Sequence, residues 1–114
     1  MDRVRSITRN VGIPPQKVRL IVNMVRGRDA VEALNVLKFM PNAAAKPVAK
    51  TIRSAIANAE ENSGLSRDDL FVAEIFANEG PSLRRGRAGA RGRYKPIRKR
   101  SSHITVVLEE RAAE

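Results

Sequence analysis

The sequence predicts an α+β domain: a three-stranded antiparallel sheet with three helices packed on one face and a long protruding β-hairpin. Strand-forming residues gather near both ends of the chain, and hydrophobic residues recur with the helical period in between. The order β-α-α-α-β-β is typical of helices segregated to one face of an antiparallel sheet. A length of 114 residues with 42% hydrophobic residues allows one small core. We therefore expect a single domain over residues 1–114, with 81–100 as an extended basic arm.

The first two elements are a charged strand and an amphipathic helix. Residues 3–9 combine strand formers with arginines and contain no helix cap. Pro14 and Pro15 end this strand, and proline suits the first turn of a helix. Gly27 is a natural stop for that helix. One apolar stripe at i, i+3, i+4 and i+7 consists of Val18, Ile21, Val22 and Val25.

A second, shorter helix is expected after residue 29. Asp29 and Glu32 have the spacing of a capping box, in which each side chain bonds to a backbone N–H near the other. Pro41 closes the helix because proline cannot continue it. Its buried stripe consists of Ala30, Ala33, Leu34 and Leu37.

A third helix follows, with Asn42 as its candidate cap and Gly64 as a left-handed stop. Pro47 would clash with the carbonyl four residues earlier, so the regular helix either begins near Pro47 or bends there. Its apolar stripe consists of Val48, Ile52, Ala55, Ile56 and Ala59.

Two strong strand signals lie in the second half of the chain. Residues 70–77 are rich in strand formers and apolar on both parities, which favours a central strand. Residues 103–108 alternate between two faces and form the last strand. These two strands should pair, yet the connection from Gly80 to Arg100 has 21 residues, far more than an ordinary hairpin loop.

The charge is unevenly distributed. The chain has 22 Lys and Arg against 12 Asp and Glu, a net charge of +10. Residues 1–28 carry +6, residues 29–79 carry −3, residues 80–108 carry +9, and the last six carry −2. This partition predicts a nearly neutral body with two basic regions, one at the amino-terminal end and one on the long connection.

Missing residue types exclude several classes of protein. Without cysteine there is no disulfide framework and no thiolate metal site, and no apolar run reaches the eighteen residues of a membrane span. The only histidine, His103, has no visible partner set for acid–base chemistry. The adjacent Asp68 and Asp69 are interpreted as turn carboxylates, not as a metal site. We therefore expect no catalytic residue, no metal and no cofactor, in a cytoplasmic protein.

The long connection carries nine cations and no carboxylate, which predicts nucleic acid as its partner. As a two-stranded ribbon, each side would reach about 30 Å beyond the body. Gly86, Gly89 and Gly92 keep the backbone thin enough to enter a narrow passage. A solvated, disordered run is the alternative; the ribbon is favoured because paired strands bracket the segment. The cations are Arg84, Arg85, Arg87, Arg91, Arg93, Lys95, Arg98, Lys99 and Arg100.

A second basic patch is expected near the amino terminus, although an ordinary solvated helix face explains its helical members equally well. His103 is interpreted as a packing residue or a polar contact to RNA. Tyr94 is the only aromatic residue of the arm, and it offers weak support for base stacking. The candidate phosphate-binding residues of the patch are Arg3, Arg5, Lys17, Arg19 and Arg26, with Arg9 and Arg28 close by in the sequence.

Several motifs together resemble one family, bacterial large-subunit ribosomal protein number twenty-two. The resemblance extends from about Val4 to Glu110, and its most specific motif spans residues 98–107. It implies an α+β body bound to large-subunit (23S) rRNA and a hairpin that lines the nascent-peptide exit tunnel near the site of macrolide antibiotics. The motifs are residues 15–20, 25–28, 54–59, 79–81 and 98–107.

The resemblance also implies roles for individual residues. The arm cations meet rRNA, other large-subunit proteins and the nascent peptide are neighbours, and subunit assembly is assisted. The family usually has Pro-Arg where this chain has Ala88-Gly89, which implies a more flexible tip with one cation fewer. Gln16 departs from the family's basic residue, whereas Lys17 and Arg19 keep their expected phosphate contacts. The implied tunnel tip consists of Arg87, Ala88, Gly89, Ala90, Arg91 and Gly92.

Two other classes of function are alternatives. A free-standing regulatory RNA- or DNA-binding protein would also carry a basic arm, but would not need one so long, so rich in glycine and so poor in aromatic residues. An enzyme would require clustered metal-binding or acid–base residues, which the sequence does not display. The prediction is a structural rRNA-binding protein whose contacts are electrostatic, without base-specific readout.

Overall fold

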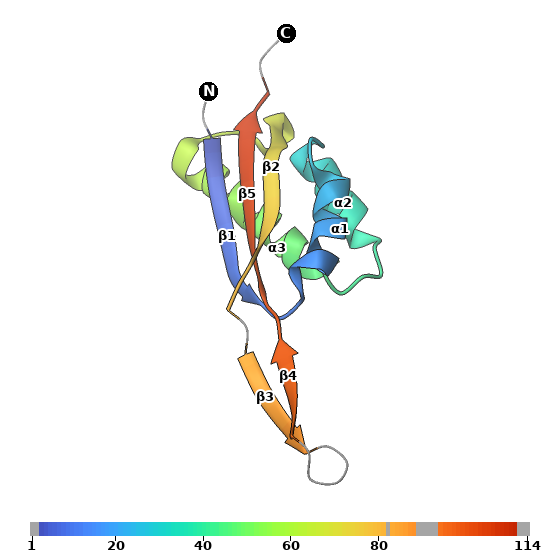
Figure 1. Cartoon of the computed structure of the whole chain (residues 1–114). Helices are drawn as coiled ribbons and strands as arrows, with labels where there is room; N and C mark the ends of the chain where they lie inside the picture. Colours follow the sequence, from blue (N-terminus) through green and yellow to red (C-terminus); the bar gives the residue numbers. More distant parts are fainter. Residues whose placement is uncertain (1–2, 82, 89–93, 112–114) are drawn as a thin grey trace.

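A computed structural model describes residues 3–81, 83–88 and 94–111; within residues 83–99 it describes the backbone. The chain forms a body with a two-stranded hairpin projecting from the end opposite the two termini (Figure 1). The elements are β1 (Arg3–Val11), α1 (Pro15–Val25), α2 (Ala30–Lys38), α3 (Ala45–Ser63), the short 3₁₀ helix η1 (Arg67–Asp69), β2 (Leu70–Glu79), β3 (Leu83–Ala88), β4 (Tyr94–Lys99) and β5 (Ser102–Glu110).

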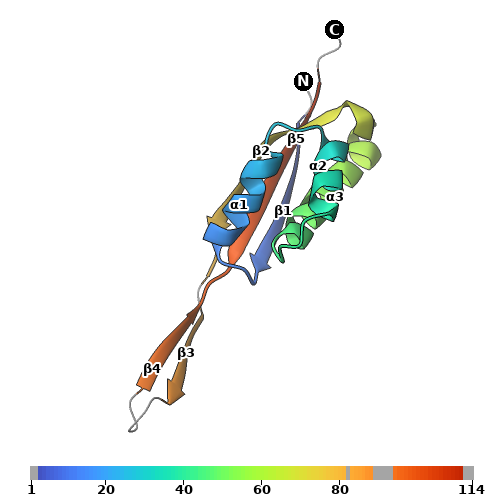
Figure 2. The same ribbon diagram turned by 90° about the vertical axis from the view of Figure 1, so that its right-hand side faces the viewer.

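The body has two layers, a three-stranded antiparallel sheet and three helices that cover one of its faces (Figure 2). The α+β prediction is therefore confirmed. The strand order is β1-β5-β2, so the prediction that residues 70–77 form the central strand is wrong. β5 is central, and all its residues from Ile104 to Leu108 are buried because strands flank it on both sides. β2 is an edge strand whose outward-facing Glu74 and Phe76 are exposed.

The core lies between the sheet and the helices. The apolar stripes of all three helices are buried as predicted, except that Leu34 is only half-buried. The helices pack on the inward side chains of β5 and β2, such as Val106 and Ile75, which are almost completely buried. Each fully buried Val, Leu or Ile contributes about 1.5–3 kcal/mol relative to an exposed one. The largest completely buried side chains include Ile21, Ile52, Leu70, Ile104 and Leu108.

The helix boundaries agree with the sequence better than the predicted caps do. Asp29 precedes α2, but its side chain makes no capping bond, so the capping box is not formed. Its Oδ1 instead accepts a hydrogen bond from Arg111 Nε at 2.6 Å, and Glu32 Oε1 accepts one from Arg28 Nη1 at 2.6 Å. Both carboxylates are therefore held by arginine side chains, which are stronger donors than a neutral backbone N–H.

The third helix also starts without its predicted cap. The residue before α3 is Ala44, not Asn42, although the Asn42 carbonyl accepts the Ala45 N–H at 3.0 Å. Pro47 lies in the first turn, where its missing N–H costs no helical hydrogen bond. Gly64 ends the helix at φ +64°, the left-handed conformation predicted for it.

The free edge of β2 is covered by the segment after α1. Gly27, at φ +82°, donates its N–H to Val72 O at 2.9 Å, and Val72 N–H donates to Arg28 O at 2.8 Å. Arginine side chains from α1 and from the residue that caps it bond further carbonyls along this edge: Arg26 Nη2 donates to Ile75 O at 2.7 Å and Arg19 Nε to Ala77 O at 3.1 Å. These contacts occupy backbone groups that an edge strand otherwise leaves open to aggregation.

The hairpin pairs β3 with β4 in antiparallel register, from Leu83 opposite Lys99 to Ala88 opposite Tyr94. At its root, Gly80 donates its N–H to Ser101 O at 2.9 Å, and Ser101 Oγ donates to Pro81 O at 2.7 Å. The molecule measures 68 × 26 × 17 Å along its principal axes, so the hairpin makes it much longer than it is wide.

Candidate nucleic-acid interface

The root of the hairpin and the start of α1 share one concave surface, which we call the root pocket. It has a volume of about 540 Å³. The segment from Pro14 to Arg19 supplies one wall, and Glu79 and Arg100 supply the other, because β2 ends and the chain returns toward β5 at this point. The root pocket thus brings together cations from the two basic regions predicted from the sequence. Lys17 and Arg19 belong to the amino-terminal region, and Arg100, at least 81 residues further along the chain, belongs to the long connection.

The electrostatics of the root pocket favour an anion. Three cations line it against one carboxylate, Glu79, and no ion pair found within the described ranges involves Lys17 or Arg100. The amino-terminal end of α1 lies in the same wall, and its helix dipole adds partial positive charge. Gln16 lies there as well, as a neutral residue beside the cations.

Arg19 and Arg26 have a structural task that the sequence did not reveal. Each uses one N–H to bond a β2 carbonyl, and Arg26 Nη1 also donates to Asn23 Oδ1 at 2.8 Å. A guanidinium has five donors, so these bonds leave further N–H groups for a phosphate while fixing where the group lies. For these two arginines the sequence left a phosphate-binding patch and a solvated helix face equally open, and the structure shows both held along the β2 edge.

The cations of β1 lie elsewhere, on the sheet face that the helices leave open. Arg3 Nη2 is 2.5 Å from Glu74 Oε2, and its Nε is 3.5 Å from Glu109 Oε1. Two carboxylates thus compensate the charge of Arg3, which weakens its candidacy for phosphate binding. Arg5 is exposed on the same face, beside a shallow hollow of about 320 Å³ that Phe76 also lines.

His103 has a packing role at the junction between body and hairpin. Its Nδ1 accepts a hydrogen bond from the Asn10 backbone N–H at 3.1 Å. Asn10 has φ +58° and lies where the register of β1 shifts between Thr8 and Val11. The half-buried ring also faces Gly80, where an added Cβ would lie 3.2 Å from His103 Cε1. A backbone donor and close packing explain this histidine without any catalytic partner.

The hairpin register brings cationic positions together. Arg84 is paired with Arg98, and Arg87 with Lys95. Like charges at opposed positions destabilise an antiparallel pair, so this ribbon gains most from a bound polyanion. Two of the six tip residues, Arg87 and Ala88, belong to the end of β3. The other four tip residues, Gly89, Ala90, Arg91 and Gly92, and the arm residue Arg93 lie outside the described residues.

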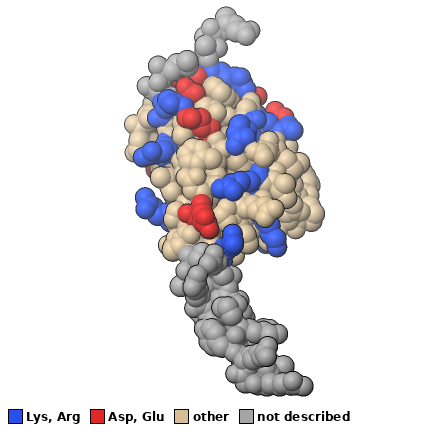
Figure 3. Space-filling model, in the orientation of Figure 1, with Lys and Arg blue, Asp and Glu red and all other residues tan. Residues whose placement is uncertain are grey.

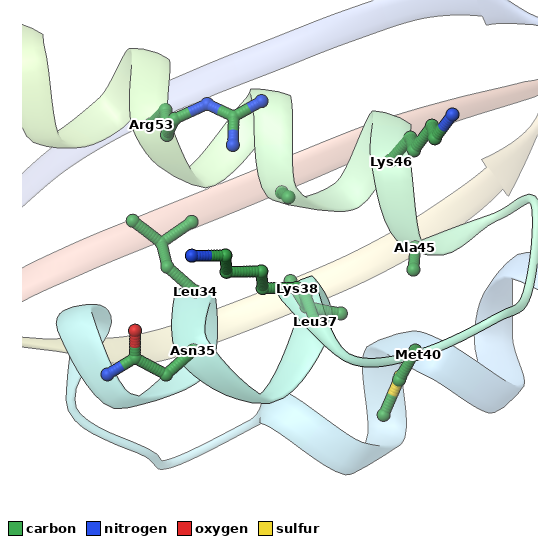
Figure 4. A pocket seen from close by; sticks show the side chains of 9 residues that line it. Leu34, Asn35, Leu37, Lys38, Met40, Ala45, Lys46 and Arg53 are labelled. Carbon is green, nitrogen blue, oxygen red and sulfur yellow. The ribbon is translucent and has the colours of Figure 1, made fainter.

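One cationic surface was missed at the sequence level. Lys38 of α2 and Lys46 and Arg53 of α3 line a groove between these two helices (Figure 4). The sequence did not predict this surface, because residues 29–79 carry a net negative charge and a net charge does not show where the positive side chains lie. The signal was the spacing of Lys46 and Arg53, seven residues apart and hence on one face of α3. Figure 3 shows a different side of the body, where the sheet faces the viewer and cations lie among fewer carboxylates.

Other kinds of site find no support within the described ranges. There is no group of three potential metal ligands there, and Asp68 and Asp69 lie in η1 as turn carboxylates. No helix in the part of the chain that the structure describes is long and apolar enough to cross a membrane.

A small α+β body with cations gathered at the root of a basic hairpin defines a class of protein suited to binding folded nucleic acid. Within that class, the chain belongs to the ribosomal protein L22p/L17e family, whose sequence pattern matches residues 6–109. It is similar to the large ribosomal subunit protein uL22 of Streptococcus pyogenes serotype M6, with 47% identity over 111 residues that cover 97% of each chain. The resemblance inferred from the motifs is confirmed.

Proposed function

We propose that this chain is a structural constituent of the large subunit of the cytoplasmic ribosome, where it binds 23S rRNA and contacts other large-subunit proteins. The observation that carries this proposal is family membership over residues 6–109 together with the cations gathered in the root pocket. A free-standing regulatory protein is disfavoured, because this chain belongs to a family of ribosomal proteins.

The proposed mechanism is charge neutralisation. Residues 1–114 act as one rRNA-binding domain, and residues 81–100 are its arm. Each Lys or Arg that meets a phosphate releases a condensed counterion, which drives binding and makes it sensitive to salt. Arg19 and Arg26 enter this interface already ordered by β2, so they lose little freedom on binding. The proposed RNA-binding residues are Arg5, Lys17, Arg19, Arg26, Arg84, Arg85, Arg87, Arg91, Arg93, Lys95, Arg98, Lys99, Arg100 and His103.

The hairpin is proposed to do more than anchor the body. We infer that it crosses packed rRNA, assists subunit assembly and ends at the wall of the nascent-peptide exit tunnel, with residues 87–92 nearest the peptide. The length of the molecule, 68 Å against 26 and 17 Å across, supports such a reach. So does the pairing of β3 with β4, which keeps the arm only two strands wide.

We propose no catalytic activity for the chain. Its only histidine already accepts a backbone hydrogen bond through Nδ1. Binding and shaping RNA require none of the acid–base or nucleophilic groups that an enzyme would place there.

Sedimentation of cell lysates tests the proposed function. The chain, tagged at its carboxyl end, should sediment with the large subunit at moderate salt. A variant that lacks residues 85–93 should keep a folded body but leave the large-subunit fractions. A wild-type chain found free or with small ribonucleoproteins would contradict the proposal.

A further inference from the structure

The groove between α2 and α3 is a binding site in its own right. It has a volume of about 350 Å³, and side chains from both helices line it (Figure 4). Every charged group that the structure describes in the lining is a cation, and the floor between these cations is aliphatic. The floor consists of Leu34, Leu37, Met40, Ala45 and Ala49; the charged and polar groups are Lys38, Lys46, Arg53 and Asn35.

An exposed aromatic ring adjoins the groove. Phe39 directly follows α2 and is 81% exposed, more than the other large hydrophobic residues on the described surface. Its backbone is nevertheless ordered, because the Phe39 and Met40 N–H groups donate to the last helical turn at 3.4 and 3.2 Å. Lys38 Nζ lies 6.0 Å from the ring centroid. Aromatic rings stack on unpaired bases and cations bind phosphates, so this ring beside Lys38 offers both kinds of contact at one place.

We propose that this groove, with Phe39 at its end, binds an unpaired nucleotide extruded from large-subunit rRNA. The base stacks on Phe39, its edge reaches the Asn35 amide, and the ribose lies on the aliphatic floor. Lys38 on one wall and Lys46 and Arg53 on the other hold the phosphates that flank the nucleotide. The inference rests on the proposed function and adds to it a contact that distinguishes unpaired from paired RNA.

The chemistry of the groove favours this occupant over an RNA duplex. Paired bases are stacked inside the duplex, so their faces cannot contact Phe39. The phosphates of a duplex would make no favourable contact with the aliphatic floor. Extruded bases, by contrast, are bound by stacking on aromatic and apolar side chains and by hydrogen bonds to their edges.

The same features favour RNA over a protein segment. A nucleotide has a phosphate on each side, which matches cations on both walls of the groove. A helical peptide would need acidic residues on both of its flanks to meet Lys38, Lys46 and Arg53. The preference for a polyanion is also that of the whole chain, with its net charge of +10.

Chemical footprinting of intact 23S rRNA with the purified full-length chain tests the proposal. Base-specific methylation and 2′-hydroxyl acylation should show unpaired nucleotides that the wild-type chain protects. Phe39→Ala should lose this protection, because stacking of one base on an aromatic ring changes its binding by about fivefold or more. Lys46→Gln should weaken the same protection.

Lys50→Gln is the matched control. Lys50 is exposed on α3, one turn from Lys46, and does not line the groove. This variant removes the same charge and should leave the protected nucleotides unchanged. Thermal unfolding checks that Phe39→Ala and Lys46→Gln remain folded, as expected for exposed residues outside the core.

Failure of the groove proposal and failure of the proposed function give different footprinting results. If the wild-type chain binds no 23S rRNA, the proposed function itself fails. If it binds and protects RNA around the arm, but no unpaired nucleotide depends on Phe39, the groove proposal is overturned and the proposed function stands. A photoreactive benzoylphenylalanine at position 39 should crosslink to rRNA in assembled subunits; a crosslink to a protein instead would overturn the proposal as well.

Discussion

The structure separates two arginines that the sequence treats alike, Arg3 and Arg100. Arg3 is held by Glu74 and Glu109, whereas Arg100 lines the root pocket without an ion-pair partner among the described residues. We therefore predict that Arg100→Gln weakens binding to large-subunit rRNA and makes it less sensitive to salt. Arg3→Gln should change the salt dependence little, because its charge is already compensated.

The magnitude follows from counterion release. Each lost phosphate contact reduces the slope of log K against log salt by about 0.7 to 0.9. Over a fourfold increase in salt, the wild-type affinity should thus fall about threefold more than that of Arg100→Gln. Lys17→Gln, in the same pocket, should behave like Arg100→Gln, and the double variant should show about twice the change in slope.

Fluorescence anisotropy with a labelled large-subunit rRNA fragment, titrated between about 50 and 200 mM salt, measures these slopes. The matched comparison is Arg3→Gln, which removes the same side chain from the opposite side of the body. Equal slope changes for Arg3→Gln and Arg100→Gln would mean that the ion pairs of Arg3 do not keep it from phosphates, contrary to this prediction.

Three further predictions concern the body and the arm. Deleting residues 85–93 should leave the cooperative unfolding transition in place, as measured by circular dichroism, because the deletion removes no core residue; loss of the transition would make the arm part of the core. Thr51→Val removes the buried hydroxyl that donates to Pro47 O and pairs with Thr8 Oγ1, and should cost about 1–2 kcal/mol in chemical unfolding. Combining Thr8→Val with Thr51→Val should recover part of that loss of stability, because neither hydroxyl is then left without its partner. If the free-energy costs of the two single substitutions simply added, the hydrogen bond between the Thr8 and Thr51 hydroxyls would be contradicted. Arg67 holds the pKa of Glu60 below its ordinary value through a side-chain hydrogen bond. The stability that this hydrogen bond adds is therefore present above the unfolded pKa near 4.5 and is lost as pH falls through the folded pKa. Arg67→Gln should raise the Glu60 pKa in an NMR titration, and an unchanged pKa would contradict Arg67 as the cause.

The helices were predictable because their signals are local. The stripe from Val18 to Val25 and the left-handed stop at Gly64 each depend on residues within a few turns of one another. The predicted caps failed for the opposite reason. Asp29 bonds Arg111, 82 residues away, and no local pattern reveals that a distant arginine will compete for a capping carboxylate.

The order of strands was also beyond local signals. Residues 70–77 look like a central strand because they are apolar on both parities, yet β2 lies at the edge. Its outward Phe71 lies beneath Arg111, whose guanidinium carbon is 4.6 Å from the ring centroid, and its free edge is covered by Gly27 and Arg28. Both protections come from segments remote in the sequence, so the composition of β2 resembled that of an interior strand.

The sequence predicted which regions of the candidate site are basic, but not which of their side chains lie together. The two basic regions were visible in the sequence, and the structure joins them through Lys17, Arg19 and Arg100 at the root of the hairpin. Counting charge alone did not show that Arg3 is neutralised or that Lys38, Lys46 and Arg53 gather in one groove. Such distinctions depend on which side chains the fold brings together.

The chain is proposed to bind large-subunit rRNA through its arm and the root pocket. Crosslinking in intact cells, followed by sequencing of the attached RNA, tests these contacts. Crosslinks should fall overwhelmingly in 23S rRNA, and Arg100→Gln and Lys17→Gln should deplete those near the root of the arm. Crosslinks concentrated in messenger or small regulatory RNA would contradict it.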